Sequence, residues 1–468
     1  MSDDRAARRD VAFFGHPAGL GWLSGSEFWE RFSYYGMQAL LVLYMTHALL
    51  NPGHVEHVLG FGPFRRLLEA VYGPLPPQAL ASAIFGLYAG LVYLTPIAGG
   101  WLADRVIGRT RAVVTGACLM AAGHFLMAFE VSFLPALLCL LLGAGLFKGN
   151  IATQVGSLYG PEDPRRADAF QVYLFGIQLA VIASPLVCGT LGEVYGWHWG
   201  FGAAGVGMLI GLSVYLIGRP TLPKEAPIAR GGAASPRPPL ERGDRAKILL
   251  LLALLPVLAV GQVGNGEIFN AYMVWAEANY QLVVAGAKMP VTWLLSFGSI
   301  ISAATIAMSV VFWRWWATRW TEPDELAKIA LGMTLAACAP LVLALASAVE
   351  AATGHRLGLG WAAAFQLVND LGFANVFPVG LALFTRAAPK AMTGAIVGCY
   401  YLHLFLGSLL VGWLGGRLST MPATSFWLLH AGLVFGAALV MLAVRLTAGR
   451  ILAPPYEPPA HELVEAVA

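Results

Sequence analysis

The 468-residue sequence has few charged side chains. Asp, Glu, Lys and Arg make up 12% of it, against roughly 25% in soluble domains, whereas hydrophobic residues make up 58%. So few charges cannot cover the surface of a soluble protein of this length. The composition excludes a soluble fold and predicts an integral membrane protein.

Cysteine is scarce too, and the sequence begins without an apolar leader. All five cysteines lie in apolar stretches, which argues against a disulfide framework, and no metal site is expected. The first residues, M-S-D-D-R-A-A-R-R-D, are charged and lack the apolar core of a signal peptide, so none is expected. Because the net charge is only +3, a nucleic-acid partner is not expected.

Twelve apolar stretches are each long enough to cross a bilayer, which takes about 20 helical residues. The segment between the sixth and the seventh is rich in Pro, Gly and Arg, which is typical of a flexible, solvated linker. We therefore expect an N-terminal six-helix bundle (1–218), a linker (219–247) and a C-terminal six-helix bundle with a tail (248–468). The predicted spans are 22–49, 80–102, 112–130, 133–157, 168–191, 198–218, 248–275, 290–316, 327–349, 358–386, 391–415 and 424–446.

Lys and Arg are distributed unevenly between the predicted loops. Of the 29, one set of alternate loops holds 22 and the other set holds five, while Arg31 and Lys148 lie inside spans. Because positive residues collect on the cytoplasmic side, both termini and the linker are predicted to be cytoplasmic. An all-α membrane protein of two six-helix bundles with a cytoplasmic linker resembles the major facilitator transporters, whose site lies centrally between the bundles.

Ionisable residues inside the spans are costly to bury and are therefore candidates for function. The first span places five polar residues on one helix face: Glu27, Glu30, Arg31, Tyr34 and Gln38. This face is expected to line a polar cavity; the alternative is a structural ion-pair cluster that pins the first helix. Over all spans four carboxylates face two cations, and an excess of buried negative charge favours binding of protons or of a cationic ligand. The six charged residues are Glu27, Glu30, Arg31, Lys148, Glu267 and Asp370.

Several motifs are similar to those of one known family. E-F-W-E-R-F-S-Y-Y-G-M in the first span resembles the E-x-x-E-R-F-x-Y-Y-G signature of the proton-coupled oligopeptide transporters (the POT family). G-A-G-L-F-K-G-N-I-A-T-Q in the fourth span is similar to the second signature of that family, and F-P-V-G-L-A-L-F-T-R in the tenth resembles its S-P-V-G-L-S segment. The resemblance implies proton-driven uptake of di- and tripeptides by alternating access. It also implies a monomer in the bacterial inner membrane that is not an enzyme and, being driven by the proton gradient, needs no cofactor.

The resemblance also assigns roles to individual residues. It implies that Arg31 and Lys148 bind the carboxylate of the peptide, and that Glu27 and Glu30 take part, with Arg31, in proton coupling. The remaining positions that align with the substrate site of the family are Tyr34, Tyr88, Gln178 and Tyr400.

The second half departs from the family pattern. Gln38 stands where members commonly have an arginine that pairs with an acid of the seventh helix, so Glu267 is expected to lack a partner and to serve as a second proton site. Phe373 aligns with the glutamate that receives the peptide amine. Asp370, one helical turn earlier, is expected to replace it, with help from Asn369 and Asn375. His430 in the twelfth span is expected to be a hydrogen-bonded packing residue.

Two other functions stay open at this point. A facilitator for another carboxylate-bearing solute is the first, because the acid for the amino end is displaced. A polytopic membrane enzyme is the second, although the sequence has neither metal-ligand spacing nor a serine or cysteine nucleophile motif.

Overall fold

The computed structural model describes residues 10–160, 162–225, 240–241, 243–284 and 286–452. Most of the predicted linker, the tail and the arginines Arg5, Arg8 and Arg9 therefore lie outside the described residues. The described chain is built from helices and one short antiparallel hairpin, β1 (Val283–Val284) with β2 (Ala287–Lys288). The prediction of an all-α membrane protein is thus confirmed.

The first half of the chain forms helices where the first six spans were predicted. One additional helix, α3 (Phe61–Tyr72), follows the first span, where the sequence has charges and prolines. The long helices of this half are α2 (Ala18–Tyr44), α4 (Pro77–Leu102), α5 (Arg109–Leu126), α6 (Phe133–Ser157), α7 (Arg165–Ser184) and α8 (Trp197–Gly218).

The second half agrees with the prediction except at its first span. The continuous helix expected over 248–275 is wrong, because the chain bends by 51° after α9 (Asp244–Gly261) and continues through α10 (Val263–Gly266) and the turn η8 (Glu267–Phe269) into α11 (Ala271–Asn279). The other helices are α12 (Trp293–Ala317), α13 (Glu325–Thr353), α14 (Gly360–Ala387), α15 (Thr393–Tyr400), α16 (Leu402–Gly415) and α17 (Ala423–Leu452).

Within the described residues, nine helices are long and apolar enough to cross a membrane, or ten if the bent pair is one span. The two remaining predicted spans, α2 and α5, are helical as well. Because α2 carries the charges of Glu27, Glu30 and Arg31, apolarity alone does not identify it as a membrane span. The number of twelve spans stays a prediction.

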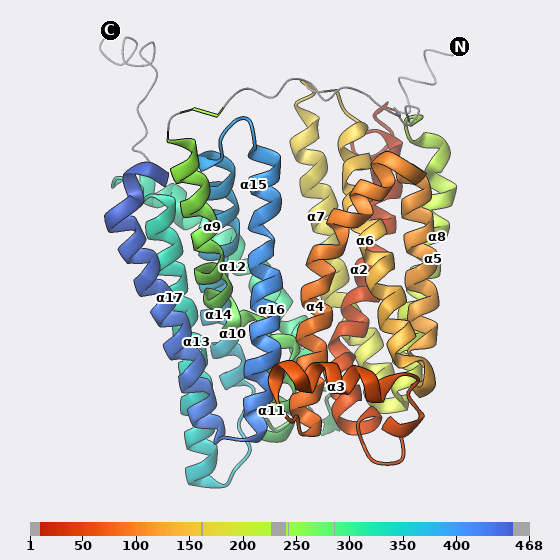
Figure 1. Ribbon diagram of the computed structural model, residues 1–468, viewed down its shortest axis with the longest axis vertical. Helices are drawn as coiled ribbons and strands as arrows, with labels where there is room; N and C mark the ends of the chain where they lie inside the picture. The colour runs from red at the N-terminus through yellow and green to blue at the C-terminus, as the bar shows by residue number, and fades with distance from the viewer. Residues whose placement is uncertain (1–9, 161, 226–239, 242, 285, 453–468) are drawn as a thin grey trace.

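Helices of the first half and helices of the second half stand side by side (Figure 1). The start of α2 and the end of α17 lie at the same end of the molecule, which we call the terminal end. Helix α3 lies across the opposite end, roughly perpendicular to the long helices (Figure 1). We call the described residues up to 225 the first half and those from 240 onward the second half.

The two halves are in close backbone contact where α4 meets α16. A Cβ atom on Gly86 would stand 2.5 Å from the carbonyl oxygen of Ser408 and 2.6 Å from the Cα of Gly412. Both are backbone atoms, so only glycine permits this approach. Next to it, the side-chain amide of Gln78 donates to the carbonyl of Gly415 at 3.1 Å.

Polar contacts close the end opposite the termini. The carboxylate of Glu193, just after α7, accepts hydrogen bonds from the backbone of Val291 (2.8 Å) and of Thr292 (3.0 Å) and from the Thr292 hydroxyl (2.6 Å), at the start of α12. His47, just beyond α2, lies 3.0 Å from Glu277 on α11. In the described chain, every recorded hydrogen bond or ion pair between the halves involves residues at or near this end.

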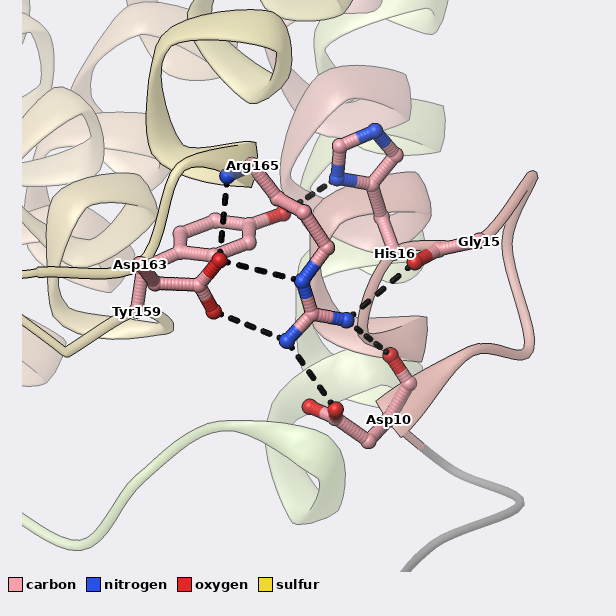
Figure 2. Close-up of polar contacts among 6 residues, drawn as sticks. All are labelled: Asp10, Gly15, His16, Tyr159, Asp163 and Arg165. Carbon is pink, nitrogen blue, oxygen red and sulfur yellow. Dashed lines mark hydrogen bonds and ion pairs between the residues drawn. The ribbon is translucent and has the colours of Figure 1, made fainter.

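At the terminal end, polar contacts hold the segment before α2 against the start of α7 (Figure 2). The Arg165 guanidinium lies 2.8 Å from the carboxylate of Asp163 and 3.0 Å from that of Asp10. His16 shares a 3.0 Å hydrogen bond with the hydroxyl of Tyr159. Arg165 lowers the pKa of Asp163 by hydrogen bonding, and burial raises the pKa of Tyr159 to about 12. All these partners belong to the first half.

Candidate functional site

The polar face of α2 forms a buried charged cluster. Glu27, Glu30 and Arg31 expose 2%, 0% and 8% of their surface. The Arg31 Nε lies 2.7 Å from Glu27 Oε1 and 2.7 Å from Glu30 Oε2, so one guanidinium serves two carboxylates. The second oxygen of each carboxylate has no hydrogen-bond partner among the described residues. Buried oxygens without donors favour protonation or the arrival of a new donor.

Lys148 completes this cluster from α6. Its Nζ lies 4.0 Å from the centroid of the Tyr34 ring, and the guanidinium of Arg31 lies 5.8 Å from the same ring. The electron-rich face of Tyr34 thus holds two cations close to each other, an arrangement stabilised by cation–π attraction. As a whole residue, Lys148 is only partly buried.

Helix α2 contacts the second half through the neighbour of Tyr34. Tyr35, the neighbour of Tyr34, lies 6.1 Å from the ring of Phe269 in η8, measured between ring centroids. Gln178 on α7 is half-buried. Tyr88 on α4 is buried, and within the described chain its hydroxyl has no hydrogen-bond partner.

The charges of this cluster balance when all four groups are ionised. With Glu27, Glu30, Arg31 and Lys148 all ionised, the group is neutral. A ligand carboxylate that joins it adds one negative charge at low dielectric, which is costly unless a proton joins as well. The cluster can therefore bind a carboxylate and a proton together.

Asp370 lies in the second half, on α14. It is buried, and its carboxylate accepts hydrogen bonds from Gln366 at 2.9 Å and from Asn369 at 3.2 Å. Asn375, expected to assist it, is occupied elsewhere, since its side-chain oxygen accepts a 2.6 Å hydrogen bond from the indole of Trp313. Phe373, at the family's acidic position, stacks on Phe377 with ring centroids 5.5 Å apart.

Tyr400 is packed inside the second half. It is completely buried, its hydroxyl donates to the carbonyl of Phe377 at 2.6 Å, and its ring lies against those of Phe384 and His403. The structure records no contact between Tyr400 and the α2 cluster in the part of the chain that it describes. A role for Tyr400 in substrate binding stays a prediction.

The expectation that Glu267 lacks a partner is wrong. Its Oε1 lies 3.2 Å from the Nε2 of His430 on α17, and its Oε2 accepts hydrogen bonds from the side chain of Asn270 at 2.9 Å and the backbone of Ala271 at 3.1 Å. The sequence separates Glu267 and His430 by 163 positions, so no local spacing reveals this pair. His430 therefore does more than pack, because it also contacts the carboxylate of Glu267.

Metal ligation is not supported by the described residues, because no group of three or more His, Cys, Asp or Glu among them lies close enough together to hold an ion. The expectation of a metal-free, cofactor-free protein stays a prediction.

Comparison with known proteins gives consistent results. A model of the POT family matches residues 110–232 and 268–427. The chain is 30% identical to the peptide transporter YePEPT of Yersinia enterocolitica, over 92% of this chain and 94% of that protein. It is 28% identical to a di-/tripeptide transporter of Lactococcus lactis, over 84% of this chain and 88% of that protein.

Solved structures show the same fold. A crystal structure of a peptide transporter POT in complex with sulfate superposes with a TM-score of 0.79 and 27% identity, over 94% of this chain and 96% of the other. A mutant peptide transporter POT in complex with alafosfalin matches with the same TM-score and identity, over 94% and 97% of the two chains.

Proposed function

The chain belongs to the POT family, and from this premise we propose that it couples proton entry to the uptake of di- and tripeptides. The relatives named as peptide and di-/tripeptide transporters support this substrate class. In this proposal the two six-helix halves (1–218 and 248–468) alternate access to a site between them, and the protein works as a monomer.

One observation carries the proposal: a single guanidinium, Arg31, lies 2.7 Å from both Glu27 and Glu30 beside the ammonium of Lys148. A peptide carboxylate competes with the two glutamates for Arg31. A proton on Glu27 or Glu30 releases Arg31 and keeps the cluster neutral, so peptide and proton bind favourably together. Coupled binding of this kind is what a symporter requires.

The other candidate residues would complete recognition of the peptide. We assign Asp370 to the peptide ammonium because it is an acid of the second half that accepts hydrogen bonds from the neutral amides of Gln366 and Asn369, and because neutralising a buried ammonium requires a carboxylate. Tyr34, Tyr88 and Gln178 would contact the peptide from the first half, and Tyr400 from the second.

Orientation follows from the charge distribution. The terminal end would face the cytoplasm of a bacterium, because 22 of the 29 Lys and Arg residues belong to the loops on that side. The contacts of Glu193 and His47 then close the external side of the inner membrane, and the described conformation is closed toward the outside.

The test is uptake of labelled dialanine by proteoliposomes with an imposed pH gradient, with recovery of the unchanged peptide. Lys148→Ala should abolish driven uptake, whereas Lys390→Ala, at an exposed lysine, should leave it unchanged. Near-normal driven uptake by Lys148→Ala would remove Lys148 from the site.

If the wild type transports only acids without a free amine, the second candidate, a facilitator of another carboxylate-bearing solute, is correct. The apolar Phe373–Phe377 stack at the expected acidic position favours this candidate. Recovery of a hydrolysed product would indicate an enzyme.

A further inference from the structure

A crevice between the two halves lies at the end opposite the termini, where α3 lies across the molecule next to α16 (Figure 1). The end of α3 and the start of α4 form one wall, and α16 with the turn η9 (Gly416–Ser419) forms the other. The crevice has a volume of about 120 Å³, several times the ~30 Å³ that a water molecule occupies in the liquid. It therefore has room for a small polar group such as a phosphate. The lining includes Tyr72, Leu75 and Ala79 of the first half and Trp413, Arg417 and Thr420 of the second.

The charge of this crevice is positive. Among the described residues that line it, Arg417 is the only charged one, and none is an Asp or a Glu. The guanidinium of Arg417 lies 4.8 Å from the centroid of the Trp413 ring, and this is its only polar contact recorded in the described part of the chain. Stacking on the indole orients the guanidinium and leaves the N–H groups at its edge available to an anion.

The wall from the first half is held in a fixed position by an ion pair of α3. The Arg65 Nε lies 2.9 Å from Glu69 Oε1. Arg65 also donates a hydrogen bond to the carbonyl of Leu75 at 3.2 Å, and the backbone N–H of Leu75 donates to Glu69 at 3.3 Å. Both backbone groups of Leu75 are thereby bound, so the crevice is a formed site. The carboxylate of Glu69 is engaged within the first half and does not neutralise Arg417.

The crevice opens at the level of a membrane surface. Helices α4 and α16 belong to segments that are long and apolar enough to cross a bilayer, and the crevice lies at their ends. Tyr and Trp, here Tyr72 and Trp413, are typical of the headgroup level. Trp413 and Leu406 are exposed on one face of α16, and Val71 is exposed on α3. Exposed apolar side chains beside a cation favour a ligand that has both acyl chains and an anionic group.

The crevice exists only while the two halves touch at this end. A Cβ atom on Gly416 would stand 2.9 Å from the Cβ of Ala79, so the two walls are in close contact below the opening. When α4 separates from α16, Arg417 moves away from Tyr72 and Leu75. A ligand that contacts both walls therefore binds more tightly to the conformation that is closed at this end, and it shifts the equilibrium toward that conformation.

From these observations we propose that the crevice binds the headgroup of an anionic phospholipid, such as phosphatidylglycerol, and that the bound lipid stabilises the closed conformation. The phosphate accepts hydrogen bonds from Arg417, and the acyl chains lie along the exposed apolar side chains of α16 and α3. A zwitterionic headgroup binds more weakly, because its ammonium finds no carboxylate in the lining. This site lies outside the proposed peptide site, and binding of the lipid does not depend on the proposed function.

Native mass spectrometry of the purified protein with added phosphatidylglycerol or phosphatidylcholine tests the binding. The wild type should retain phosphatidylglycerol in preference. Arg417→Gln should lower the apparent affinity for it about tenfold, the loss expected for one charge-assisted hydrogen bond. Arg66→Gln, at an exposed arginine of α3 outside the lining, should leave the affinity unchanged. If Arg417→Gln does not fold, Trp413→Leu replaces it, because it removes the indole that orients the guanidinium and keeps an apolar surface.

Two results would overturn the lipid assignment. Equal affinities in the wild type and Arg417→Gln would exclude the crevice, and equal losses in Arg417→Gln and Arg66→Gln would indicate a general effect of surface charge. Soluble glycerol phosphate has the anionic group without acyl chains and should not displace the lipid. Displacement by it would identify an aqueous phosphate compound as the ligand instead.

Pulsed electron paramagnetic resonance tests the conformational effect. Spin labels at Asn51 and Thr353, two exposed positions on different halves at this end, report their separation in lipid nanodiscs. Replacing half of the phosphatidylcholine by phosphatidylglycerol should increase the fraction of short distances in the wild type and in Arg66→Gln but not in Arg417→Gln. The same response in Arg417→Gln as in the wild type would refute the stabilisation. Neither measurement involves peptide or protons, so failure of the proposed function leaves both tests valid.

Discussion

The contact between α4 and α16 predicts that a single methyl group shifts the conformational equilibrium. In Gly86→Ala the new Cβ would stand 2.5 Å from the Ser408 carbonyl oxygen and 2.8 Å from the Gly412 nitrogen. Backbone atoms cannot rotate away, so α4 and α16 must separate by about 1 Å to reach an ordinary contact distance. Overpacking of this kind costs about 1–3 kcal/mol, and only in conformations in which these helices touch. The ratio of molecules in which α4 and α16 are apart to molecules in which they touch should therefore rise by a factor of about 5–150.

Pulsed electron paramagnetic resonance measures this shift directly. In a background with the five cysteines replaced, spin labels at Asn51 and Thr353 report the separation of the two halves at the end opposite the termini; both positions are exposed. Gly86→Ala should increase the fraction of long distances, and so should Gly412→Ala, which meets the same contact from the other side.

Two controls on the same helix isolate the cause. Gly100→Ala meets no described atom within 4 Å and should change nothing. Gly99→Ala meets the backbone of Gly145 within the first half, so it should lower thermal stability without changing the distance distribution. Identical distance distributions in the wild type, Gly86→Ala and Gly412→Ala would refute the reasoning.

Two further predictions follow from buried and surface carboxylates. Asp370→Asn should weaken competition by free dipeptides at least about tenfold and by N-acetylated ones little, because only a free ammonium needs the carboxylate; equal weakening of both would exclude the amine role. Asp163→Asn should lower the unfolding temperature at pH 7, because Arg165 lowers the pKa of Asp163 below its ordinary 3.8 and stability from such a group is present above that value. The difference from the wild type should vanish as the pH falls through the lowered pKa, and Asp168→Asn, at an exposed carboxylate, should show neither effect; a difference that persists at low pH would exclude the ionic explanation.

The sequence predicts the helices well because a membrane span is a local property. About 20 apolar residues in succession suffice to define one, and the positions of α4, α6 and α13 agree with the predicted stretches within a few residues. The α2 cluster was predictable for the same reason, since Glu27, Glu30 and Arg31 are neighbours on one helix turn. The break after Gly261 was missed because the span was defined by the apolar residues on both sides, although the polar, glycine-rich stretch 261–267 between them indicates an interruption of the helix.

Contacts between distant elements were not predictable. His430 reaches Glu267, and Glu193 reaches Thr292, only through the packing of α17 and α12. No local sequence pattern around His430 or Glu193 identifies the residue that it contacts. Asn375 shows the opposite error. Its place near Asp370 on the same helix suggested a shared role, whereas its side chain accepts a hydrogen bond from Trp313 on another helix.

The central claim is that peptide and proton cross the membrane together, and the most direct test measures protons that a peptide alone moves. Proteoliposomes holding a trapped pH-sensitive dye, with equal pH on both sides and the membrane potential clamped at zero, receive external dialanine. The account predicts that the lumen becomes more acidic as labelled dialanine enters, and that Lys148→Ala abolishes both signals. Entry of dialanine with no change in luminal pH would contradict it.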